Sequence, residues 1–201
     1  MPLHPATADS AFGADGNTLV FRANDADFSQ YRAIAVLPTK VYDGADTDWG
    51  GTSPQERAEL AQQVTTDFAQ ALRKAGHLAA RPGPRVLALQ LTLAGISATH
   101  SAASLTRLTP VGLGMSLVRT AEGAPAAFTG SITLAGKLTD GRTGAVLGGF
   151  LTRESPAAFD LRSSAGTMTT ASLAAAKAAD DFARAVDRAV AKLHGPRAAT
   201  P

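Results

Sequence analysis

The chain has 201 residues and a mass of 20.5 kDa, the size of one domain with short extensions at its ends. With 45% hydrophobic and 18% charged residues it can bury a core, and its formal charge of +2, from singly scattered bases, argues against nucleic-acid binding. It contains no cysteine, which excludes disulfides, thiolate metal sites and a cysteine nucleophile, and its apolar runs are far shorter than the roughly 20 residues of a membrane helix.

The two ends of the chain differ from its middle. Residues 1–17 are polar, lack periodicity and show neither the basic nor the apolar region of a secretory signal, so we predict a flexible arm suited to a tether. A single α+β domain is expected over 18–194. The remaining residues, 195–201, are predicted to be a disordered tail.

Two strands are predicted before the first helix. Residues 18–22 suit a short edge strand. Residues 33–37 form a continuous apolar run, which is typical of a strand buried on both faces. Pro38 removes a backbone donor, so this strand should end, bulge or lie at an edge there.

The first helix begins with a clear signal. Ser53-Pro54-Gln55-Glu56 is a capping box with proline at the first helical position. Gly76 suits the left-handed residue that closes the helix. Between these limits, apolar residues recur every four positions and predict one buried stripe: Leu60, Val64, Phe68 and Leu72.

After this helix, residues 85–97 alternate between leucines and smaller or polar residues, as in a strand with one face on a core. Residues 98–121 fit a loop with a short helix or a long hairpin excursion equally well. Alternation returns at 128–139 and continues at 145–153.

The sequence Asp-Gly-Arg-Thr-Gly at 140–144 predicts a hairpin turn between the last two strands. We attribute the glycines at 130, 136, 148 and 149 to bulges or to a helix lying close to the sheet. A final helix is predicted at 171–193. The order β-α-β-x-β-β-α indicates an α+β fold, in which two main helices pack on one face of a mostly antiparallel sheet of four to five strands.

An acidic, glycine-containing loop precedes the first helix. Asp43, Asp46 and Asp48 are spaced like calcium ligands, but counting from Asp46 puts Arg57 where an EF-hand needs its bidentate glutamate. Asx-turns before a helix N-terminus explain these aspartates better, and no metal or other cofactor is expected.

Two apolar features are candidates for partner binding. The only tryptophan, Trp49, is either a recognition anchor or, as we favour, a lid on the edge of the core. Asp46 and Asp48 flank it as further candidates. The nearly uncharged segment 108–118 is either an exposed patch or packed under the sheet; its candidate residues are Leu108, Val111, Leu113 and Met115.

Catalytic motifs are missing from the sequence. No two of the four histidines lie three or four residues apart, and neither Gly-x-Ser-x-Gly nor His-Glu-x-x-His occurs. We therefore expect a protein that is not an enzyme.

Several stretches together resemble a known family. They are YRAIAVLPTKVY, DTDWGGTSPQERAELAQQVTTDFAQAL, GPRVLALQLTL, TPVGLGMSLV and FTGSITLAGKLTDGRTGAVLGG, followed by the last helix. Over about residues 18–193 the chain is similar to the domain-of-unknown-function family 3313 of bacterial lipoproteins.

The resemblance implies a leader peptide with a lipid-modified cysteine and an outer-membrane or periplasmic location. This chain carries neither, as expected of a mature region. On this basis we expect a non-enzymatic lipoprotein domain of the cell envelope, on the periplasmic side, that presents a binding surface to an envelope protein. It would touch the membrane only through its N-terminal lipid. The alternative is a periplasmic module that binds a small ligand, a lipid or a peptidoglycan fragment.

Overall fold

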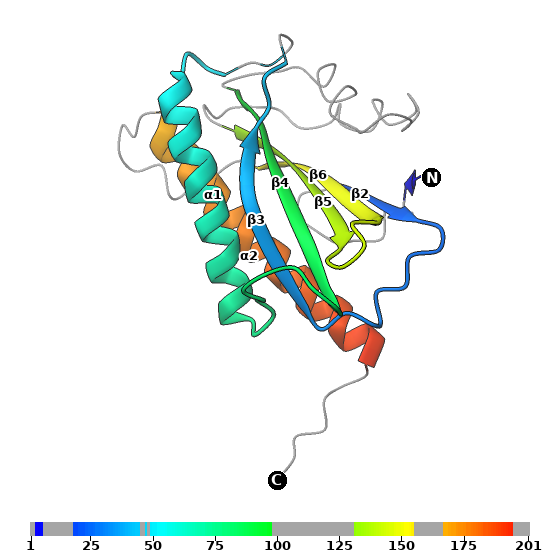
Figure 1. Cartoon of the computed structure of the whole chain (residues 1–201). Coiled ribbons are helices and arrows are strands. Elements are labelled where there is room, and N and C mark those ends of the chain that lie inside the picture. The colour runs from blue at the N-terminus through cyan, green and yellow to red at the C-terminus, as the bar shows by residue number, and fades with distance from the viewer. Residues whose placement is uncertain are drawn as a thin grey trace.

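The computed structural model describes residues 3–5, 18–44, 47, 49–97, 131–154 and 167–194. The elements follow in the order β1 (Leu3–Pro5), β2 (Thr18–Ala23), β3 (Ala33–Val41), α1 (Pro54–Lys74), β4 (Val86–Ser97), β5 (Ser131–Asp140), β6 (Val146–Glu154) and α2 (Thr167–His194) (Figure 1). The predicted α+β class is confirmed. The uncertain segment 98–121 and the tail lie outside the described residues.

The strands form one sheet in the order β1-β2-β6-β5-β4-β3. Four of its neighbouring pairs are antiparallel, whereas β3 and β4 are parallel. The sheet is therefore mixed, because α1 carries the chain back to the end of the sheet at which β3 began. The short strand β1 lies within the predicted arm and pairs with β2, so β2 is not the edge strand that we predicted.

Strand β3 lies at the edge of the sheet, one of the outcomes that Pro38 predicted. The open side of this strand is protected. Its register against β4 shifts between Leu37 and Lys40. The Thr39 N–H donates to Thr65 Oγ1 of α1 at 2.9 Å, and the Ile34 N–H donates to the His77 carbonyl at 2.7 Å. These contacts and the missing Pro38 donor leave little of the edge open to pairing with another chain.

Both helices pack on one face of the sheet, α1 over β3 and α2 over β5 and β6, and they contact each other (Figure 1). The capping box is confirmed: Ser53 Oγ accepts from the Glu56 N–H, and the Glu56 carboxylate accepts from the Ser53 N–H at 2.7 Å. The last helix begins at Thr167, four residues before the predicted Ala171.

The core between helices and sheet is centred on three phenylalanine rings. Phe182 of α2 lies with its ring centroid 5.5 Å from those of Phe68 on α1 and Phe150 on β6. A Cβ on Gly136 would stand 2.1 Å from the Phe150 ring, so this glycine makes room for an aromatic side chain of the neighbouring strand. Its role is therefore neither the bulge nor the close helix approach that the sequence suggested.

Candidate functional site

The loop before α1 holds Trp49 against the core. Its side chain is partly buried and packs on the hydrophobic cluster under the helices. The Thr52 hydroxyl and N–H both donate to the Trp49 carbonyl, at 2.7 and 3.0 Å. Gly50 and Gly51 adopt φ angles of 55° and 80°, which permit the tight turn between these residues.

Arg57 fixes the other side of the indole. Its guanidinium carbon lies 4.7 Å from the Trp49 ring centroid, a cation–π contact, and its terminal nitrogen donates to the Thr52 carbonyl. Arg57, which occupies the position where an EF-hand has its bidentate glutamate, is thus a stacking partner of the tryptophan. The result is a stacked tryptophan–arginine pair at the end of the sheet where β3 and β4 finish.

The positions of the other predicted binding residues relative to this pair are not described. Asp46 and Asp48 lie outside the described residues, as do Leu108, Val111, Leu113 and Met115. Of the predicted set, Trp49 alone is placed: it packs against the core, and part of its surface is still accessible.

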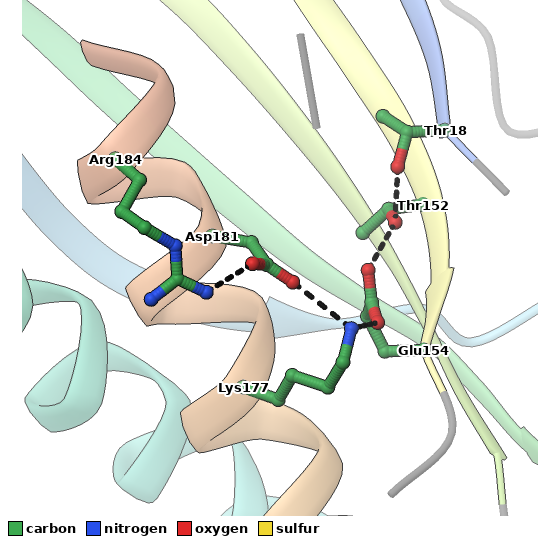
Figure 2. Close-up of polar contacts among 6 residues, drawn as sticks. All are labelled: Thr18, Thr152, Glu154, Lys177, Asp181 and Arg184. Atoms are coloured by element: carbon green, nitrogen blue, oxygen red, sulfur yellow. Dashed lines mark hydrogen bonds and ion pairs between the residues drawn. The ribbon is translucent and has the colours of Figure 1, made fainter. Parts of the chain in front are cut away.

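A second feature, which the sequence analysis missed, is a polar network between the sheet and α2 (Figure 2). Thr18 on β2 and Thr152 on β6 share a hydrogen bond of 2.7 Å, and Thr152 donates to Glu154 Oε1 at 3.1 Å. Lys177 Nζ then bridges Glu154 Oε2 at 2.8 Å and Asp181 Oδ2 at 2.9 Å. Arg184 completes the network by pairing with Asp181.

The charged groups of this network are largely shielded from solvent between the sheet and α2. The Glu154 side chain is only 5% exposed and that of Lys177 is 30% exposed. Partial burial alone would lower the pKa of Lys177, but the hydrogen bonds to Glu154 and Asp181 prevail and raise that pKa to about 12. Burial would likewise raise the pKa of Asp181, yet the bonds from Lys177 and Arg184 hold it below its usual range.

The chemistry open to the network follows from these charges. An ammonium group with a pKa of about 12 stays protonated at neutral pH and cannot serve as a general base. The contacts of the whole network connect β2, β6 and α2, so the network ties the helix to the sheet. One sequence signal was present: alternation along β6 puts Thr152 and Glu154 on the same face as Phe150, which faces the core.

A third polar contact lies at the other end of the sheet from the Trp49–Arg57 pair. Buried Tyr31 donates its hydroxyl hydrogen to Asp140 Oδ2 at 2.7 Å. Burial and this bond raise the pKa of Tyr31 to about 12. The Thr143 N–H and then the Tyr31 hydroxyl hold the pKa of Asp140 well below its usual range. The Asp140 carboxylate therefore organises the predicted hairpin turn, which is confirmed at 140–144.

Within the described ranges, no three histidine or acidic side chains gather as a metal site. The helices over those same ranges include none that is both long enough and apolar enough to cross a membrane.

A mixed sheet with two helices on one face, a stacked tryptophan–arginine pair and a buried polar tie define a small α+β domain. The chain belongs to the family described as "Protein of unknown function (DUF3313)", whose family model matches residues 9–182.

The solved structures that match this chain include two crystal forms of PelC from Paraburkholderia phytofirmans, both dodecamers. A variant PelC is 13% identical with a TM-score of 0.42, covering 82% of this chain and 96% of that chain. A second PelC structure is 12% identical with a TM-score of 0.40, covering 82% of this chain and 97% of that chain. A search of curated proteins found no match.

Proposed function

We propose that this domain is a non-catalytic protein-binding module of the bacterial cell envelope, with the Trp49–Arg57 pair at the centre of its binding surface. The observation that carries the proposal is the stacking of Arg57 on a tryptophan that remains partly exposed. Tryptophan and arginine are the residues most enriched among those that dominate binding energy at protein interfaces.

The geometry of the pair supports this role. The indole packs on the core and against Arg57, and the Arg57 guanidinium donates to the Thr52 carbonyl, so both side chains are held in place before any partner arrives. A preformed contact surface loses less conformational entropy on binding than a mobile one. The indole offers a flat apolar surface, and the guanidinium beside it offers donors to a carboxylate or a carbonyl.

The charged side chains that contact one another in the described residues have structural roles, which supports a non-catalytic function. Lys177 and Glu154 neutralise each other between sheet and helix, and Asp140 organises a turn. The lipid anchor and the envelope location belong to the same proposal, and they follow from the family resemblance. The alternative of a small-ligand module stays a prediction from the sequence.

Site-specific photocrosslinking tests the proposal. A photoreactive residue replaces Gln55, exposed in the first turn of α1 and close in the chain to Trp49 and Arg57, or Gln70, exposed near the far end of the same helix. We expect a discrete crosslinked envelope protein from position 55 and none from position 70. Trp49→Ala should weaken that complex at least about 30-fold, as for an interface hot spot, whereas Trp49→Phe should retain most of it.

The stability of each variant separates binding from folding. Trp49 also packs on the core, so Trp49→Ala should lower the melting temperature whatever the function. If the melting temperature falls but the crosslink at position 55 persists, Trp49 is a lid only and the proposed surface is wrong.

A further inference from the structure

At one end of the domain β3 and β4 begin and both helices finish (Figure 1). Exposed basic side chains are concentrated at this end. We name it the basic end. It displays eight exposed basic side chains: Arg32, Arg73, Lys74, Arg81, Arg85, Arg142, Arg188 and Lys192. These bases come from segments that lie far apart in the sequence, and the fold brings those segments together into one patch.

Backbone contacts bring the separate segments together. The Arg32 N–H donates to the Arg85 carbonyl at 2.9 Å, which joins the start of β3 to the start of β4. The Gly141 N–H donates to the Val86 carbonyl at 2.9 Å and draws the hairpin turn to the same place. The basic end is therefore a broad surface built from several chain connections.

Acidic residues at this end are fewer and mostly engaged. Four belong to it: Asp25, Asp27, Asp140 and Asp187. The Asp140 carboxylate accepts from its own turn, Asp27 accepts from the Ser29 hydroxyl at 2.6 Å, and Asp187 lies 2.7 Å from His77. Eight bases against four acids leave a clear local excess of positive charge, although the whole chain carries only +2.

One of these bases sits in a costly backbone conformation. Arg85 has a φ of 59°, the left-handed region, and no other non-glycine residue of the described ranges shows a positive φ. Glycine or asparagine would adopt this conformation more readily than arginine. The Arg85 Nε donates to the Gln30 carbonyl at 3.4 Å, and an exposed arginine at such a backbone position favours a role for its charge.

The apolar character of the basic end distinguishes between possible partners. Tyr31 is buried, and Phe28 is partly covered by the Arg22 guanidinium at 5.3 Å from its centroid. The large apolar side chain exposed there is Leu193, at 48%, next to Lys192. A specific protein interface needs a central apolar anchor in a pocket, whereas a fluid anionic surface needs only accumulated positive charge.

We propose that the basic end docks onto the phosphate headgroups of an anionic phospholipid bilayer. Each arginine can donate two parallel hydrogen bonds to a phosphate, and Leu193 can enter the headgroup layer beside them. The bilayer surface thus becomes a second membrane contact besides the expected lipid anchor.

The position of the N-terminal strand agrees with this orientation. Leu3 of β1 pairs with Ala23, the last residue of β2, at the end of the sheet shared with the loop that leads to Arg32. A lipid attached ahead of β1 would therefore lie on the same side as the basic end. This point rests on the proposed function, whereas the charge argument does not.

Vesicle co-sedimentation of the unlipidated chain tests the inference. The vesicles are phosphatidylcholine alone or equimolar phosphatidylcholine and phosphatidylglycerol, at low and physiological salt. We expect binding to the anionic vesicles only, weakened by salt because charge attraction falls off within a Debye length. Arg81→Gln/Arg142→Gln should lower the partition coefficient about 30-fold at low salt.

The matched control removes two exposed bases elsewhere. Lys40 and Lys137 lie outside the basic end, and Lys40→Gln/Lys137→Gln makes the same change in net charge. It should bind the anionic vesicles nearly as wild type. Equal losses in both double variants, or equal binding to neutral vesicles, would overturn the inference. So would binding to duplex DNA or polyglutamate without binding to vesicles, because the partner would then be another class of molecule.

Failure here and failure of the proposed function are distinguishable. The vesicle assay involves neither Trp49 nor an envelope extract, and the crosslinking assay needs no lipid. A chain that binds vesicles but gives no crosslink at position 55 keeps the basic end and loses the protein-binding surface.

Discussion

Removing the Lys177 charge from the polar network should cost more stability than the partial exposure of Lys177 suggests. In Lys177→Met the helix keeps a long side chain of similar volume, so packing changes little. The main change is at Glu154, whose side chain is 5% exposed and whose cation partner at 2.8 Å disappears, whereas Asp181 keeps Arg184. A carboxylate that is buried without a partner is among the most destabilising features of a folded chain.

The size of the effect follows from the burial of the two groups. Breaking one side of a fully buried ion pair costs about 3–5 kcal/mol. Lys177 is 30% exposed, so water reaches the site and the lower limit applies. We expect a loss of about 3 kcal/mol in the free energy of unfolding, visible as a lower urea midpoint with an unchanged m-value by circular dichroism.

A second substitution separates charge from packing. Glu154→Gln in the Lys177→Met background keeps an acceptor for Thr152 but removes the unpaired charge. This double variant should lose only about 1 kcal/mol, the scale of the remaining hydrogen-bond changes. If it is as unstable as Lys177→Met, or if Lys177→Met loses less than about 1 kcal/mol, then charge burial is not the cause and the reasoning is refuted.

Three further predictions concern stability. Ser53→Ala should cost about 1 kcal/mol, since the N-cap oxygen is lost, and Ser53→Asp should restore it in the same urea titration. The pKa of Tyr31 in the folded protein, about 12, exceeds the ordinary value of 10, so above pH 10 the unfolded chain ionises first. Wild-type stability should therefore fall between pH 10 and 12, and Tyr31→Phe should flatten that slope; parallel slopes would contradict the assignment. Gly136→Ala should cost about 2 kcal/mol through overpacking against Phe150, whereas Gly83→Ala, with no atom within 4 Å of the added Cβ, should be nearly neutral in thermal melts.

Local signals in the sequence predicted most elements of the fold. The capping box of α1, the alternation of β4 and the hairpin turn at 140–144 each depend on residues close together in the chain. Such signals determine the type of an element, and each was confirmed. The parallel pairing of β3 and β4 had a signal too, because a strand, a helix and a second strand commonly form a parallel crossover.

The sites were harder to predict because they depend on contacts between distant residues. Lys177 meets Glu154 across 23 positions, and the pairing follows from how α2 crosses β6. Arg32 and Arg85 come together through a backbone bond between two strand beginnings. Periodicity shows which face a residue occupies, but it does not show which residue of another element it meets.

The two proposed binding surfaces lie at opposite ends of the same helix, and this separation makes them independent. Helix α1 has 21 residues, so Trp49 before its N-terminus and Lys74 at its last residue are roughly 30 Å apart along the axis. The Debye length at physiological salt is about 8 Å, and charge changes at the basic end are therefore screened from the Trp49–Arg57 pair. Effects at sites so far apart normally add. A chain docked on lipid through its basic end would hold the tryptophan–arginine pair about 30 Å from the headgroups, and a partner that binds there must extend at least that far from the bilayer.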